Sequence, residues 1–122
     1  MKLIFVYNAD SGLFNALSDM AHKLLSPKTY SCQLCAITHG AFAERRQWRD
    51  FIDDLDTECE FLHRDEFEAR HPLEKQEFPA IFREQNGKLA LCASAAQIRA
   101  IDNIPALKAL LNRRCIRAEK DE

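Results

Sequence analysis

An almost unbroken run of apolar residues opens the chain, and the apolar positions after it recur at helical spacing. The run is KLIFVY, residues 2–7, whose aromatic and β-branched side chains are typical of a central strand buried on both faces. The later apolar positions are Leu13, Leu17, Met20 and Leu24. Asp10 or Ser11 can cap a helix there, and Pro27 can end it. The chain is therefore predicted to open with a strand, a turn and a helix.

A second strand and a second helix are predicted next. CQLCAIT, residues 32–38, is a short apolar run typical of a strand, and residues 44–55 place several apolar side chains on one helix face: Trp48, Phe51, Ile52 and Leu55. Two apolar strands separated by about 25 residues of helix favour parallel pairing through a right-handed crossover. We therefore expect residues 2–7 and 32–38 to pair in parallel.

The middle of the chain is rich in charge and carries weaker signals. ECEFLH, residues 58–63, is compatible with a further short strand. A helical turn is predicted from Asp65, with Glu68 completing a capping box and Pro72 following its end. We interpret this part as an insertion. Residues 63–77 are expected to be a solvated surface, with partner binding as the lesser alternative.

The last third of the chain predicts a hairpin followed by helices. Two strand-like runs within residues 78–94 are joined by Asn86-Gly87, a pair that readily adopts positive φ and favours a tight turn. Ser94 and Gln97 form a capping box. An apolar stripe, broken near Pro105, then indicates C-terminal helices: Ile98, Ile101, Leu107, Leu110 and Leu111.

This order of elements, β-α-β-α, an insertion and then β-β-α, is similar to the thioredoxin-like fold. FPAIFREQNGKLALCASAAQIRAIDNIPALKALL, residues 78–111, resembles the last third of that family. The resemblance implies an α/β three-layer sandwich around a mixed central sheet. It also implies that Pro79 is the family's cis-proline and that the Phe78 backbone is presented to a ligand. The family's redox Cys-x-x-Cys follows the first strand, where this chain has NADSGL instead.

Composition limits the class of protein. The 122 residues, 47% of them hydrophobic, suit one domain over 1–122, with 117–122 as a candidate disordered tail. Seventeen Lys and Arg against nineteen Asp and Glu, without a basic block, argue against nucleic acid as a partner. The apolar opening is too short for a signal peptide or a membrane span, so we expect a cytoplasmic protein. Five cysteines then indicate reduced thiols.

Cys32 and Cys35 are the candidate catalytic residues. Residues three apart in a regular strand point to opposite faces, so a working pair needs a turn before the strand begins near Cys35. The pair would then lie at the end of the sheet opposite the thioredoxin active end. As thiols, Cys32 would attack and Cys35 resolve. As zinc ligands they would need two more, with His22 the first choice among the histidines. In the third interpretation, Cys32 and Cys35 are ordinary strand residues without a function of their own.

Two further places can hold a ligand. Asn8, Asp10 and Ser11 follow the first strand and can orient a small molecule, although ordinary helix capping also explains Asp10 and Ser11. His39 is expected where the second strand ends, the edge where open α/β sheets bind ligands, although it can equally be a polar loop residue. Phe78 and Pro79 are added to these by the resemblance.

YNADSGLFNALSDMAHKLLSP followed by YSCQLC also resembles a group of small bacterial proteins. That resemblance implies no activity, but it adds weight to a set of polar residues: Asp10, Ser11, His22, Cys32 and Cys35. Three hypotheses remain. The chain is a thioredoxin-like, thiol-dependent oxidoreductase acting on a small thiol or a protein partner without a cofactor. It is a zinc-binding module that uses the same cysteines. Or it is a redox-inactive thioredoxin-like module that binds a small ligand or peptide.

Overall fold

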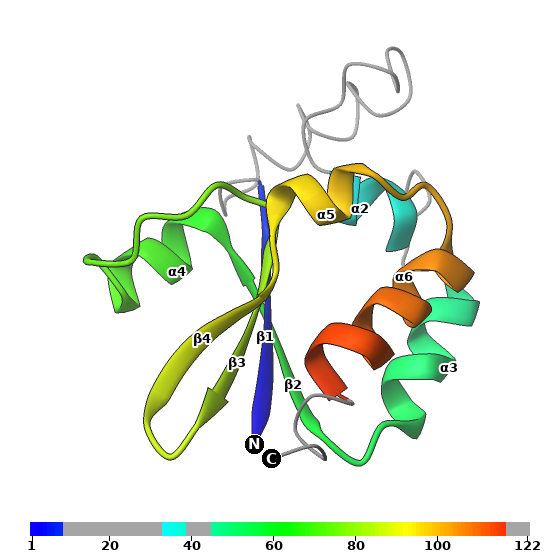
Figure 1. The fold of residues 1–122 in the computed structure, drawn as a ribbon, viewed down its shortest axis with the longest axis horizontal. Coiled ribbons are helices and arrows are strands. Elements are labelled where there is room, and N and C mark those ends of the chain that lie inside the picture. Colours follow the sequence, from blue (N-terminus) through cyan, green and yellow to red (C-terminus); the bar gives the residue numbers. More distant parts are fainter. Residues whose placement is uncertain (9–32, 39–44, 117–122) are drawn as a thin grey trace.

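A four-stranded mixed sheet forms the centre of the computed structural model, which describes residues 1–8, 33–38 and 45–116 (Figure 1). Its strands are β1 (Lys2–Tyr7), β2 (Glu58–His63), β3 (Ala80–Gln85) and β4 (Lys88–Ala93), in the order β2-β1-β3-β4. β1 pairs in parallel with β2 and antiparallel with β3, and β3 pairs antiparallel with β4. An α/β fold with a central β1 is therefore confirmed.

Helices lie on both faces of this sheet (Figure 1). They are α2 (Gln33–Thr38), α3 (Arg46–Asp54), α4 (Arg64–Arg70), α5 (Ala95–Arg99), α6 (Ile104–Leu111) and the π-helical turn η2 (Asn112–Ile116). α4 lies on one side of the sheet, whereas α2, α3 and α6 lie on the other (Figure 1). The described elements thus form three layers.

Alternate residues of β1 supply two separate cores. Leu3 and Phe5 are buried in the larger cluster with residues of α2, α3 and α6, including the fully buried Trp48. Ile4 and Val6 belong to the smaller cluster beside α4. Because side chains of a strand alternate between faces, a strand covered on both sides needs apolar residues at successive positions. This explains the unbroken KLIFVY run.

The segment predicted as the second strand is a helix. Residues 33–38 form α2, and the parallel partner of β1 is β2 instead. Leu34, Ile37 and Thr38 are buried, at positions three and four apart, which is helical spacing. The Thr38 hydroxyl donates to the Leu34 carbonyl at 2.8 Å, a bond between residues one helical turn apart. The strand prediction for residues 32–38 was wrong because the apolar positions of this short run fit both the two-residue period of a strand and the 3.6-residue period of a helix.

The middle segment is part of the core rather than an insertion. β2 forms one edge of the sheet, and α4 covers the smaller core with Phe67. The predicted cap was also wrong, since α4 is capped by His63 with Glu66 rather than by Asp65 with Glu68. The predicted helix over residues 44–55 is confirmed as α3, which begins at Arg46.

The predicted hairpin is confirmed. Asn86 and Gly87 have φ of 55° and 76° and join β3 to β4. Ser94 accepts a hydrogen bond from the Gln97 N–H and the Gln97 side chain accepts one from the Ser94 N–H, which is the predicted capping box. The Phe78–Pro79 peptide bond is cis, as the family resemblance implied.

Two cysteines are bonded to each other, which corrects the expectation of reduced thiols. Cys92 of β4 and Cys115 of η2 form a disulfide, and both lie in the larger core. Among the described cysteines, Cys59 is free. Within the described ranges, no helix is long and apolar enough to cross a membrane.

Candidate functional site at the carboxyl edge of the sheet

The carboxyl ends of β1 and β2 meet the amino end of β3 at one edge of the sheet. The parallel register places Tyr7 beside His63, and the antiparallel register places Val6 beside Ala80. Asn8 follows Tyr7, and Arg64 follows His63. The cis Phe78–Pro79 bond directly precedes Ala80. We call this set the carboxyl edge: Tyr7, Asn8, His63, Arg64, Phe78 and Pro79.

Side-chain contacts join β1 to the start of α4 at this edge. The Arg64 guanidinium donates from Nη1 to Asn8 Oδ1 at 3.1 Å. Asn8 was predicted to orient a ligand, and here it orients Arg64. The aromatic rings of Tyr7 and His63 lie 6.1 Å apart between centroids. The edge therefore combines a cation, an amide and two rings that can hydrogen-bond.

Glu66 fixes the His63 imidazole. Its Oε1 accepts the His63 backbone N–H at 2.7 Å and lies 2.8 Å from His63 Nδ1. These two hydrogen bonds from His63 lower the pKa of Glu66. Because a carboxylate accepts hydrogen bonds and cannot donate them, Nδ1 carries the proton and Nε2 is left as the ring's other polar atom. Both side chains are nearly half exposed, so a solvent-borne group can reach them.

The cis-proline segment is attached to α5. Arg99 donates from Nη2 to the Phe78 carbonyl at 3.3 Å, and its Nη1 pairs with Glu77 at 3.1 Å. Phe78 is 8% exposed and packs edge-on against Phe67, with 5.7 Å between ring centroids. The backbone before Pro79, predicted to face a ligand, therefore has its Phe78 carbonyl held by an arginine.

α2 lies at this same end of the molecule. It packs against α5, and Figure 1 shows both helices at the end of the molecule where β1 ends. Cys35 belongs to α2, so the expected position at the opposite end of the sheet was wrong. The error followed from assigning residues 32–38 to a parallel strand. The other predicted site residues lie outside the described ranges: Asp10, Ser11, His22, Cys32 and His39. Of Cys35, the structure describes the backbone and not the side chain.

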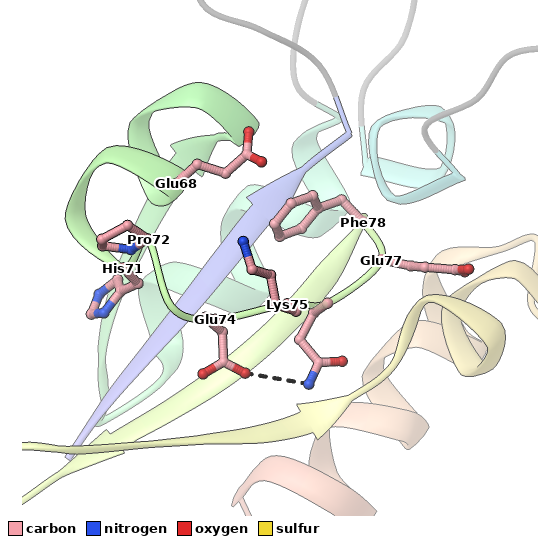
Figure 2. A pocket seen from close by; sticks show the side chains of 8 residues that line it. Glu68, His71, Pro72, Glu74, Lys75, Glu77 and Phe78 are labelled. Atoms are coloured by element: carbon pink, nitrogen blue, oxygen red, sulfur yellow. Dashed lines mark hydrogen bonds between the residues drawn. The ribbon is translucent and has the colours of Figure 1, made fainter.

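A hollow of about 440 Å³ lies beneath the connection from α4 to β3 (Figure 2). Its lining residues are Glu68, His71, Pro72, Glu74, Lys75, Gln76, Glu77 and Phe78. In Figure 2, the Lys75 side chain extends from the connection toward Phe78, whereas Glu77 points away from the other side chains. The hollow adjoins the carboxyl edge at Phe78. Its charges are mixed, and Leu73 beside it is 91% exposed.

The described cysteines and histidines do not assemble a metal centre. Among residues 1–8, 33–38 and 45–116, no three His, Cys, Asp or Glu side chains are grouped to hold an ion. Cys92 and Cys115 are bonded to each other. Burial, with a smaller contribution from Glu58, raises the pKa of the Cys59 thiol to about 11, so Cys59 is a poor metal ligand and nucleophile.

Sequence reasoning did not place His63, Arg64 or Arg99 at the carboxyl edge, although His63 was among the possible zinc ligands. His63 and Arg64 directly follow ECEFLH, so recognising that run as the parallel partner of β1 would have placed them at the carboxyl edge. Arg99 carries no such signal, because its contact with Phe78 depends on how α5 packs. Comparisons of the chain with protein-family models, curated proteins and solved structures found no match.

Proposed function

We propose that this chain is a thioredoxin-like protein that carries out thiol–disulfide exchange through Cys32 and Cys35. One observation carries the proposal. α2, which contains Cys35 and begins one residue after Cys32, packs on α5, and Arg99 of α5 binds the Phe78 carbonyl beside the cis-proline. A Cys-x-x-Cys and a cis-proline at one end of a mixed sheet are the two parts that the family resemblance calls for.

The sheet topology supports the fold half of this proposal. The thioredoxin-like order needs a central first strand, a parallel neighbour, and then an antiparallel hairpin introduced by a cis-proline. β1, β2 and the β3–β4 hairpin have these directions, and Pro79 directly precedes β3. Helices on both faces complete the three layers (Figure 1).

Helical geometry removes the main objection to a working cysteine pair. Residues three apart point to opposite faces of a strand but lie on neighbouring positions of one helix face. Cys35 belongs to α2, which begins at Gln33, the residue after Cys32 in the sequence. In the proposed reaction, the Cys32 thiolate attacks a substrate disulfide and releases one substrate thiol. Cys35 then attacks the mixed disulfide, which forms Cys32–Cys35 and releases the second thiol. Two electrons pass from the cysteine pair to the substrate.

Exchange with glutathione disulfide tests this proposal. Reduced protein is mixed with the disulfide, and the released thiol is measured for wild type, Cys32→Ser and the matched control Cys59→Ser. We expect Cys32→Ser to lose the reaction and Cys59→Ser to keep it. Here wild type denotes the chain that carries Cys92→Ser and Cys115→Ser alone, and both variants carry these two substitutions as well, which removes the second disulfide from the count. Equal rates for wild type and Cys32→Ser would contradict the proposal. Stoichiometric zinc that is lost in Cys32→Ser would replace it with the metal module.

A second candidate function rests on the carboxyl edge alone. Arg64, whose guanidinium donates to Asn8, presents a cation at this edge, which suits a carboxylate or another small anion. A redox-inactive binding module would use this edge without either cysteine. Thermal stabilisation by small carboxylates, lost in Arg64→Gln but kept in Cys32→Ser, would favour it. Stabilisation that is unchanged in Arg64→Gln would exclude it.

A further inference from the structure

The Cys92–Cys115 disulfide joins two peripheral elements. β4 is an edge strand of the described sheet, and η2 is the last described turn of the chain. The two Cα atoms are 5.3 Å apart, and the cysteines are separated by 23 positions in the sequence. β1, at the centre of the sheet, takes no part in this bond. The bond can therefore open without separating β1 from β2 or β3.

Both ends of the bond depart from regular structure. Ile81 pairs with Ala93 and Phe82 pairs with Leu91, so Cys92 is an extra residue without a partner in β3. Such a bulge redirects side chains, and Cys92 joins the core that contains η2. η2 is itself a π-helical turn. π-helical turns are rare and are often found at functional sites. The disulfide therefore joins a β-bulge in β4 to a π-helical turn.

Most of η2 faces solvent. Its residues Asn112, Arg113 and Arg114 are exposed, whereas Cys115 is fully buried. Ile116 is only partly buried against the larger core. By contrast, α6, which precedes η2, buries four apolar side chains: Ile104, Leu107, Leu110 and Leu111. Breaking the bond therefore weakens the hold on η2 far more than the hold on α6.

We propose that the Cys92–Cys115 bond is a reversible redox latch that controls the release of η2 from β4. A dithiol is the reductant. Its thiolate attacks one sulfur of the bond to form a mixed disulfide, and its second thiol closes the dithiol into a disulfide. Cys92 and Cys115 gain two electrons and two protons and become thiols. The reduced state keeps the sheet and α6 folded and lets η2 detach. This inference does not depend on Cys32 or Cys35.

Amide hydrogen exchange measured by mass spectrometry tests the latch. The protein carries Cys32→Ser and Cys35→Ser, so that Cys92–Cys115 is the redox-active pair under study. Exchange is compared before and after treatment with dithiothreitol and after reoxidation. We expect amides of residues 112–116 to exchange on the order of tenfold faster or more in the reduced protein, while β1 amides stay protected. Reoxidation should restore the slow rate.

Three outcomes would overturn the latch. The bond would be a permanent structural link if dithiothreitol cannot reduce it in the folded protein, or if reduction exposes β1 amides as much as residues 112–116. Unchanged exchange at residues 112–116 after reduction would show that packing alone holds η2. Cys115→Ser provides an independent comparison and should exchange like reduced protein with or without dithiothreitol. Should that variant not fold, the reduced protein with both cysteines still decides the question.

Discussion

Phe67→Ala is expected to lower the free energy of unfolding by about 3–5 kcal/mol. Phe67 is the buried residue of α4 and is fully inaccessible to solvent. Its ring stacks on Phe82 at 4.7 Å between centroids and meets Phe78 edge-on at 5.7 Å. Removing the ring loses about 1.5–3 kcal/mol of apolar burial, and the remaining cost comes from the cavity and the lost ring contacts.

The assay is urea and thermal unfolding followed by circular dichroism. For a chain of this length, a loss of 3–5 kcal/mol corresponds to a fall in Tm of about 12–20 °C. Glu68→Ala is the matched control, because Glu68 is the exposed neighbour on the same helix and should change stability by no more than about 0.5 kcal/mol. A loss below about 1 kcal/mol for Phe67→Ala would refute the packing of α4 on the sheet.

Three further predictions concern single groups. Because burial raises the pKa of Cys59 to about 11, its alkylation at neutral pH should be about a hundredfold slower in folded than in urea-unfolded protein, and equal rates would show that it is exposed. Arg70, and to a smaller extent Lys2, lower the pKa of Glu60. The ionised Glu60 carboxylate therefore stabilises the folded protein at pH values above the ordinary pKa of a glutamate. This stabilisation is lost as the pH falls through the lowered pKa. Glu60→Gln should therefore flatten the acid limb of the stability–pH curve, and an identical limb would contradict the contacts. Gly87 has φ of 76° with open space around its missing Cβ, so Gly87→Ala should cost about 1–2 kcal/mol through backbone strain alone, measured by urea unfolding. A neutral result would mean that the turn has a different conformation.

Elements with one dominant local signal were predictable from the sequence. KLIFVY is apolar at every position but the first and became the central strand, and Asn86-Gly87 fixed the hairpin because few other pairs accept positive φ twice. Residues 32–38 were ambiguous, since a seven-residue, mostly apolar run satisfies both the period of a strand and the period of a helix. Tertiary packing of Leu34 and Ile37 decided in favour of a helix.

The candidate site was harder to predict because it depends on which strands are neighbours. Asn8, Phe78 and Pro79 were named in advance, and all three lie at the carboxyl edge. His63 was considered only as one of several possible zinc ligands and was not placed at this edge, since the strand before it was treated as part of an insertion. The misassigned strand also placed Cys35 at the wrong end of the sheet. One error of secondary structure therefore put the predicted thiol site at the wrong end of the sheet.

The state of the Cys32–Cys35 pair in mildly oxidised protein tests the central claim most directly. Trypsin cleavage after Lys28 and Arg45 yields the peptide 29–45, which holds both cysteines. The account predicts that oxidation makes this peptide lighter by two hydrogen atoms and that a dithiol restores its mass. Oxidation that leaves both cysteines as alkylatable thiols, or that joins them only to other peptides, would contradict a working pair at the carboxyl edge.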